Sequence, residues 1–166
     1  DIFQEEVNIA IWQNRPTEEI LKSINNIMQK EGRIRVVTDV APDEVVEHLI
    51  QRYDELGQEK AFCHHIALLV DMFCTLFELK RVGLRLTTLD QAMCPKFHVD
   101  KVPCRLITTF SGAATQWLPH ETVDRSLLGA GSLGIVDELS GLIKDPLHVQ
   151  NLAAGDVALL KGESWF

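Results

Sequence analysis

The sequence predicts an α+β fold in a single domain, with a mainly helical layer over residues 1–80 and a β-rich body over residues 81–166. Apolar residues recur at helical spacing in the first part, whereas after Lys80 they alternate with polar residues at a period of two. The chain has 166 residues, 46% of them hydrophobic, and is therefore long enough to bury a substantial core.

The first elements follow from local signals. Residues 7–12 (VNIAIW) form a short apolar run that predicts a strand. Pro16 and the acidic residues after it indicate the start of an amphipathic helix, because negative charge in a first turn interacts favourably with the helix dipole. We expect Gly32 to end this helix.

A second strand and two further helices complete the predicted helical layer. Residues 33–40 (RIRVVTDV) are rich in β-branched side chains and predict the strand. Asp43 is a suitable N-cap for a helix that ends before Gly57. Residues 59–80 are apolar around most of the helix circumference, so we expect this helix to be central and largely buried.

The remaining strands are predicted in the second half of the chain. Residues 82–88 alternate as a half-buried strand does, and residues 104–110 are also strand-like. Residues 112–115 (GAAT) indicate a turn, and Gly155-Asp156 leads into the apolar run VALLK.

Composition narrows the possible functions. A net charge of −8 argues against non-specific nucleic-acid binding, which requires a basic surface. No apolar run is long enough for a membrane span. The four cysteines form no CxxC pair, which favours a reducing, cytoplasmic location. The chain starts without methionine and stops abruptly, and we expect it to be truncated, in particular beyond Phe166.

The densest group of potential metal ligands lies between residues 94 and 106. His98 and Asp100 are two residues apart, so on an extended segment their side chains project from the same face. An imidazole and a carboxylate with open positions left over is the ligand set of a non-haem Fe(II) site, and it also suits zinc. The sequence therefore predicts His98 and Asp100 as metal ligands.

The order of the motifs resembles the prolyl-hydroxylase-like branch of the Fe(II)/2-oxoglutarate oxygenases. His-x-Asp is followed by a strand that Arg105 opens, by a Gly turn with Thr115, and later by the Gly-Asp strand. The resemblance implies a double-stranded β-helix (cupin-like or jelly-roll-like) barrel, with the helices packed on it. It also implies Fe(II) and 2-oxoglutarate as cofactors, catalytic and cofactor-binding roles for Arg105, a cofactor-binding role for Thr115, and a further histidine ligand beyond Phe166.

A second resemblance covers roughly residues 7–165. It is to an uncharacterised bacterial domain-of-unknown-function family whose members are often encoded near zinc-homeostasis genes. The motifs that carry it are LLVDMF (68–73), CPKFHVDKVPCRL (94–106), TQWLP (115–119), GLIKD (141–145) and GDVALLKGESW (155–165). This resemblance implies a relative and a setting in metal homeostasis, but no reaction.

The cysteines beside the motif leave the identity of the metal undecided between iron and zinc. Cys94 lies four residues before His98, and a closed zinc site from Cys94, His98, Asp100 and Cys104 is conceivable because zinc prefers thiolate and imidazole ligands. Cys104 equally fits a strand core as a small hydrophobic residue. Cys94 therefore remains a candidate metal ligand.

Other potential ligands are given structural roles. Cys63, His64 and His65 are consecutive on a helix and cannot converge on one ion without outside partners. His48, His120 and His148 are expected to be surface residues. GAGSLG (129–134) matches a dinucleotide-binding pattern but lacks the flanking strand and helix, so a flexible loop is expected.

Three functions follow. The leading one is a metal-binding protein with an oxygenase-like site that binds a small-molecule ligand. In its enzyme version it is an Fe(II)/2-oxoglutarate-dependent oxygenase. The alternative is a non-catalytic zinc-binding accessory protein that serves a metal-handling partner. The third is a scaffold that retains an eroded site for folding. Neither nucleic acid nor membrane is an expected partner.

Overall fold

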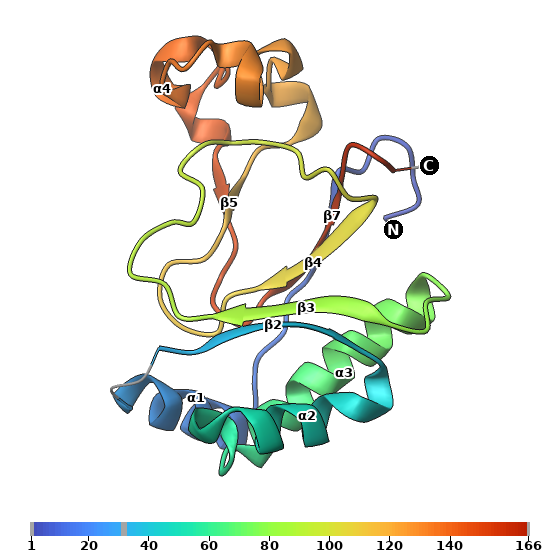
Figure 1. Ribbon diagram of the computed structural model, residues 1–166. Helices are drawn as coiled ribbons and strands as arrows, with labels where there is room; N and C mark the ends of the chain where they lie inside the picture. Colours follow the sequence, from blue (N-terminus) through green and yellow to red (C-terminus); the bar gives the residue numbers. More distant parts are fainter. Residues whose placement is uncertain (1, 31–32, 166) are drawn as a thin grey trace. The chain divides into compact units, whose positions relative to one another are not determined.

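The structure is a computed structural model that describes residues 2–30 and 33–165. The chain divides into two compact units. We call Pro16–Gln91 the hairpin unit, and Asp1–Arg15 with Ala92–Phe166 the motif unit. Both combine helical and extended elements, so the predicted α+β class is confirmed (Figure 1).

In its described residues, the hairpin unit contains three α-helices and a two-stranded antiparallel sheet. The helices are α1 (Glu18–Gln29), α2 (Val45–Arg52) and α3 (Lys60–Leu76). Strands β2 (Arg35–Val40) and β3 (Val82–Thr87) pair in register from Arg35 opposite Thr87 to Val40 opposite Val82. Helix α3 packs against α1, α2 and β3, and the helices lie on one side of the hairpin in Figure 1.

Local signals account for the start of α1 but not for the start of α2. The Thr17 side chain accepts a hydrogen bond from the Ile20 N–H at 3.4 Å and caps α1. The predicted N-cap Asp43 is wrong, because Pro42–Glu44 forms a short 3₁₀ turn (η1) and α2 begins only at Val45. Proline suits the first position of such a turn because its missing N–H would have no partner there. The Glu44 carboxylate accepts the Ala41 N–H at 3.3 Å, a contact that caps η1.

The ends and exposure of the helices refine two further predictions. Helix α1 ends at Gln29, and the predicted stop at Gly32 lies outside the described residues. Helix α3 buries Phe62, Cys63, Ile66, Leu69 and Val70, as expected for a central helix. Its opposite face exposes a stripe of apolar side chains, so the helix is less completely buried than its composition suggests; the stripe contains Leu68, Met72 and Leu76.

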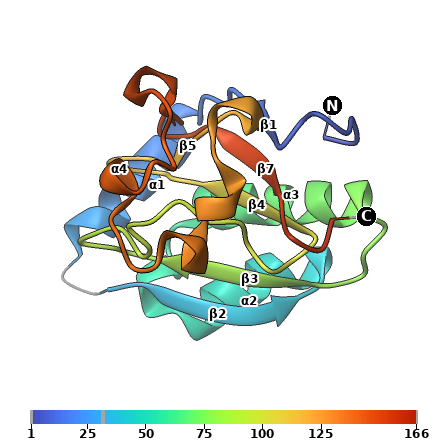
Figure 2. The same cartoon turned by 90° about the horizontal axis from the view of Figure 1, so that it is seen from above.

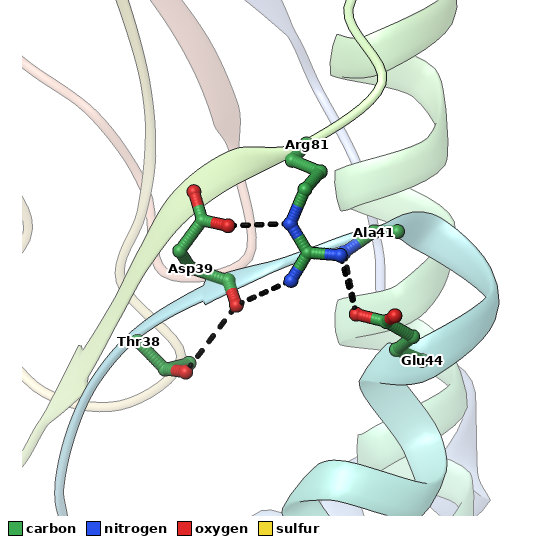
Figure 3. A network of polar contacts seen from close by, with 5 residues as sticks. All are labelled: Thr38, Asp39, Ala41, Glu44 and Arg81. Carbon is green, nitrogen blue, oxygen red and sulfur yellow. Dashed lines mark hydrogen bonds and ion pairs between the residues drawn. The ribbon is translucent and has the colours of Figure 1, made fainter.

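An ion-pair network joins the end of the hairpin to the turn before α2 (Figure 3). Arg81 Nε donates to Asp39 Oδ1 at 2.5 Å, and Nη1 donates to Glu44 Oε2 at 2.8 Å. Nη2 donates to the Asp39 carbonyl oxygen at 3.0 Å. All three guanidinium nitrogens are thus used to connect the chain after α3 with β2 and η1.

The motif unit is organised around strand β7 (Val157–Lys161), which lies between β1 (Ile9–Trp12) and β4 (Cys104–Thr108). Both pairings are antiparallel, with Leu160 opposite Ile9 on one side and Arg105 on the other (Figure 1 and Figure 2). Strands β5 (Gln116–Trp117) and β6 (Gln150–Asn151) form a second, two-residue pair. Gly155 has φ +94° and makes the predicted turn into β7.

Short helical turns occupy the chain between β5 and β6. They are η3 (His120–Thr122), η4 (Arg125–Leu127), η5 (Gly129–Ser132), α4 (Asp137–Ser140) and η6 (Pro146–His148). Leu142 is fully buried and Leu118 and Leu152 nearly so, which gives this part of the unit an apolar core. The strands of the described residues form small antiparallel sheets, and none of these closes into the barrel that the resemblance implied.

A helix needs about 20 predominantly apolar residues to span a bilayer. Within residues 2–30 and 33–165, no helix is long and apolar enough to do so.

Candidate functional site

The predicted ligands lie on an irregular segment, residues 94–103, which we call the motif loop. Its C-terminal end rests against the chain that leaves β7. The Gly162 N–H donates to the Pro103 carbonyl and the Glu163 N–H donates to the Asp100 carbonyl, both at 2.8 Å. A Cβ atom at Gly162 would lie 1.6 Å from the Val102 carbonyl oxygen, so only glycine allows this approach.

The N-terminal end of the motif loop is bound by residues 132–137. Lys96 Nζ donates to Ser132 Oγ at 3.1 Å and to the Ile135 carbonyl at 2.7 Å. Asp137 Oδ2 accepts the Phe97 N–H at 2.6 Å. The loop is therefore held from both sides by segments distant in sequence, as a binding site requires.

His98, Asp100 and Arg105 come together at the entry to β4. His98 Nε2 lies 3.6 Å from Asp100 Oδ1, and Arg105 Nε lies 2.8 Å from Asp100 Oδ2. The Asp100 side chain is 22% exposed, whereas those of His98 and Arg105 are 44% and 45% exposed. The two oxygens of Asp100 thus face different partners, an imidazole and a guanidinium.

The orientation of His98 defines which nitrogen is available. Nδ1 lies 2.9 Å from the Lys96 carbonyl oxygen. A carbonyl oxygen can only accept, so Nδ1 carries the hydrogen and the neutral ring keeps a lone pair on Nε2. That lone pair is on the nitrogen nearest Asp100, and an Nδ1–H to carbonyl bond is the usual second contact of a metal-ligating histidine.

The cysteines differ sharply from one another. Cys94 is exposed, and its Sγ lies 3.7 Å from the same Lys96 carbonyl that His98 contacts. Burial raises the pKa of the Cys104 thiol in β4 to about 11, which keeps it protonated and argues for a packing role. Within residues 2–30 and 33–165, no three His, Cys, Asp or Glu side chains form a group that could hold an ion, so Cys94 does not complete the pair.

Thr115 is not brought to this pair. It is exposed beside β5, and its carbonyl accepts the Leu152 N–H at 3.0 Å, which extends the β5–β6 pairing by one bond. Among the described residues, no hydrogen bond joins Thr115 to His98, Asp100 or Arg105. The contact that Thr115 makes here is therefore a structural one, through its backbone carbonyl.

The remaining histidines occupy the places expected of structural residues, with one exception. His64, His120 and His148 are exposed, and burial lowers the pKa of His65 on α3. The predicted surface residue His48 is instead half-buried, because its ring lies against Tyr53 with a centroid distance of 6.2 Å.

Sequence reasoning missed Lys96 and Asp137, and it assigned GAGSLG to a flexible loop. Residues 129–132 of that segment form η5, and Ser132 receives Lys96, so the segment supports the motif loop. Asp137 acts on a residue 40 positions earlier in the chain. No local pattern signals such a contact, since a side chain that binds a distant backbone N–H has no characteristic spacing.

Comparison with known proteins gives a family and no activity. Neither a curated protein nor a solved structure matched the chain. One family model matches residues 1–166, the whole of the sequence. The chain belongs to that family, which is described as protein of unknown function (DUF1826).

Proposed function

We propose that this protein binds a divalent metal ion between His98 and Asp100. The observation that carries the proposal is the orientation of His98, whose Nδ1 contacts the Lys96 carbonyl and whose Nε2 is 3.6 Å from Asp100 Oδ1. Two ligand atoms that each lie about 2.1 Å from one ion are roughly 3.0–3.4 Å apart. A small side-chain adjustment would bring these two atoms to that separation.

The pair supplies two ligands of the types that Fe(II) and zinc accept. Asp100 contributes negative charge, and His98 contributes a neutral nitrogen that needs no deprotonation. The remaining coordination positions are left to water, to a small-molecule ligand, or to a residue outside the described segments. Open positions of this kind are a property of catalytic rather than of structural metal sites.

Within this proposal the leading reaction class is that of an Fe(II)/2-oxoglutarate-dependent oxygenase. It is supported by the order of motifs around His-x-Asp and by the position of Arg105 beside Asp100. Arg105 Nε binds Asp100, and the half-exposed guanidinium has two further terminal nitrogens, donors of the kind that bind carboxylates. When bound, Fe(II) and oxoglutarate would supply the oxygen chemistry, and Arg105 would orient the cosubstrate carboxylate.

A zinc-binding accessory role is the second candidate, and the position of Cys94 favours it. The Cys94 thiol and the His98 imidazole contact the same carbonyl oxygen, at 3.7 Å and 2.9 Å. The Cys94 side chain is exposed and can change its rotamer, and as a ligand its sulfur would have to move to the Nε2 side of His98. The resemblance to a family encoded near zinc-homeostasis genes supports the same role.

The test is metal content measured on purified protein after anaerobic loading with Fe(II) or Zn²⁺. We expect one equivalent in the native protein and loss of binding in His98→Ala and in Asp100→Ala, with His148→Ala as a control for removing an exposed histidine. Metal content unchanged in both site variants would overturn the proposal and leave the scaffold reading.

The two candidates are separated by a second measurement. Conversion of oxoglutarate to succinate that depends on Fe(II) and is lost in His98→Ala would support the oxygenase. Zinc binding that is lost in Cys94→Ser, without oxoglutarate turnover in the native protein, would support the accessory role.

A further inference from the structure

One peptide group lies between a buried carboxylate and the candidate ligand His98. The group joins Lys96 to Phe97. Its N–H donates to Asp137 Oδ2 at 2.6 Å, and its carbonyl oxygen lies 2.9 Å from His98 Nδ1. Because a trans peptide is planar and its N–H and C=O point in opposite directions, the two contacts constrain one rigid plane from both sides.

We infer that Asp137 is a positioning residue for His98 and acts through this peptide group. Asp137 does not touch the imidazole. By holding the N–H, it sets the direction of the carbonyl, and the carbonyl then selects the ring orientation and the hydrogen-bearing nitrogen of His98. The chain of contacts ends at Nε2, the atom that the proposed function assigns to the metal.

The charge of Asp137 strengthens this arrangement. The residue is 6% exposed, so solvent screens its carboxylate little. A hydrogen bond to an ionised acceptor is roughly twice as strong as one to a neutral acceptor. It also polarises the peptide, which makes the Lys96 carbonyl a better acceptor for the His98 Nδ1–H. Carboxylates commonly orient metal-ligating histidines directly, and here a peptide group stands between the two.

Lys96 supports the same arrangement from its side chain. Its ammonium group donates to the Ser132 hydroxyl and to the Ile135 carbonyl, two residues before Asp137. One residue thus supplies the carbonyl that His98 contacts and the cation that holds the segment bearing Asp137. In Figure 1 the turns around α4 lie next to the irregular chain that leads into β4.

The inference has a consequence in the metal-free protein. We expect His98 to be almost entirely the Nδ1–H tautomer at about pH 9, where histidine is ordinarily neutral. Asp137→Asn keeps the size of the side chain and removes its charge, and it should raise the ratio of Nε2–H to Nδ1–H tautomer by about threefold or more. Asp137→Ala removes both the charge and the acceptor and should raise the ratio further.

The matched control is Asp145→Asn. Asp145 Oδ1 also accepts a backbone N–H, that of Leu147, at 2.9 Å, and it makes this contact at the start of η6. The variant removes a carboxylate of the same kind without altering the Lys96–Phe97 peptide. We expect it to leave the His98 tautomer ratio unchanged.

The measurement is a long-range ¹H–¹⁵N correlation spectrum of the apo protein, which separates the two tautomers of His98. An unchanged ratio in Asp137→Asn would overturn the inference, and this variant decides the matter even if Asp137→Ala does not fold. A raised ratio in Asp137→Asn but not in Asp145→Asn would support it.

The effect on metal affinity rests on the proposed function and is measured separately. If the proposal holds, Asp137→Asn should weaken divalent metal binding by roughly tenfold, a loss typical for partners of ligating histidines. If Asp137→Asn shifts the tautomer ratio but the native protein binds no metal, the positioning role is supported and the proposed function is overturned. If the native protein binds metal but Asp137→Asn leaves the tautomer ratio unchanged, the proposed function is supported and the positioning role is overturned.

Discussion

Each compact unit contains an arginine–aspartate pair near the end of a strand, and the two pairs differ in how many of their polar atoms are already bonded. In the hairpin unit, all three guanidinium nitrogens of Arg81 donate hydrogen bonds, two to Asp39 and one to Glu44 at 2.8 Å (Figure 3). In the motif unit, Arg105 binds one oxygen of Asp100, and the other oxygen lies 3.6 Å from His98 Nε2.

The exposure of the two aspartates follows the same division. The Asp39 side chain is 66% exposed and that of Asp100 is 22% exposed. An exposed ion pair contributes little to stability because water screens it, whereas a half-buried carboxylate with a free oxygen can bind a cation more strongly. The first pair is thus complete as a structural contact, and in the second pair Asp100 Oδ1 lies 3.6 Å from His98 Nε2, beyond hydrogen-bond distance. Four experiments sharpen this comparison.

The largest effect is expected from adding one methyl group behind the motif loop. Gly162→Ala would place Cβ 1.6 Å from the Val102 carbonyl oxygen, and backbone would have to move on both sides. We expect the free energy of unfolding, measured with urea, to fall by roughly 3 kcal/mol or more. Gly83→Ala in β3 is the control, because a Cβ there meets no atom within 4 Å. Equal stability of the two variants would mean that the loop is not held by this approach.

Thiol labelling should separate the motif loop from the sheet beside it. Cys94 is exposed, whereas burial raises the pKa of Cys63 and of Cys104 to about 11. A thiol with a raised pKa has little thiolate at about pH 8, so we expect labelling of Cys94 to be roughly 100-fold faster. Stopped-flow absorbance with a disulfide reagent measures the rates, and Cys94→Ser should remove the fast phase. A fast phase that persists would place reactivity elsewhere.

Removal of the two arginines should have different consequences for metal binding. Arg105→Gln removes a cation 2.8 Å from Asp100 and frees the oxygen that it occupies. We expect divalent metal affinity, measured by calorimetry at low ionic strength, to rise about threefold or more. The matched variant Arg81→Gln should leave it unchanged. A loss of affinity as large as that in Asp100→Ala would instead show that Arg105 is needed to hold the carboxylate.

The smallest effect is expected at Glu44 in acid. The hydrogen bond from the Ala41 N–H, and then Arg81, lower the pKa of Glu44 below its ordinary value of 4.5. A carboxyl with a lowered pKa in the folded state stabilises the fold above its unfolded value, and that contribution is lost as the pH falls through the folded pKa. The melting temperature of Glu44→Gln should therefore be lower than that of the native protein near neutral pH.

The difference between Glu44→Gln and the native protein should disappear below the folded-state pKa, and thermal melts between about pH 6 and pH 3 measure it. Glu138→Gln, which removes another exposed carboxyl, controls for net charge. A difference in melting temperature that stays constant down to the lowest pH would show that the ionised form of Glu44 does not cause it.

Much of the secondary structure was predictable because its signals are local. Residues 9–12, 35–40, 82–87, 104–108 and 157–161 are strands where the patterns indicated them. The start of α2 was not predictable in detail, because Asp43 is the suitable N-cap by type. Pro42 instead opens η1, and α2 begins after Glu44, which binds Arg81 from 37 residues away.

The candidate site divides in the same way. His98 and Asp100 were identified from their spacing, and the structure places their side chains within 3.6 Å of each other. Arg105 joins them because β4 begins right after the loop. Thr115 was grouped with them by the order of motifs along the chain, and order carries no information on the distance between segments. Cys94 lies in the same loop as His98, yet within the described residues it completes no group of three ligands.

The sequence by itself determined the class of the fold, its longer strands and helices, and the two residues proposed as the candidate metal pair. These depend on properties that are read within one or two turns of the chain. Only the tertiary structure decided that Gly162 lies behind the motif loop, that Asp137 reaches Phe97, and that His98 leaves Nε2 free. The first two contacts join segments tens of residues apart, and the third depends on a peptide group that Asp137 holds from a distance. Their geometry depends on how β7 and the turns around α4 pack, which no local pattern encodes.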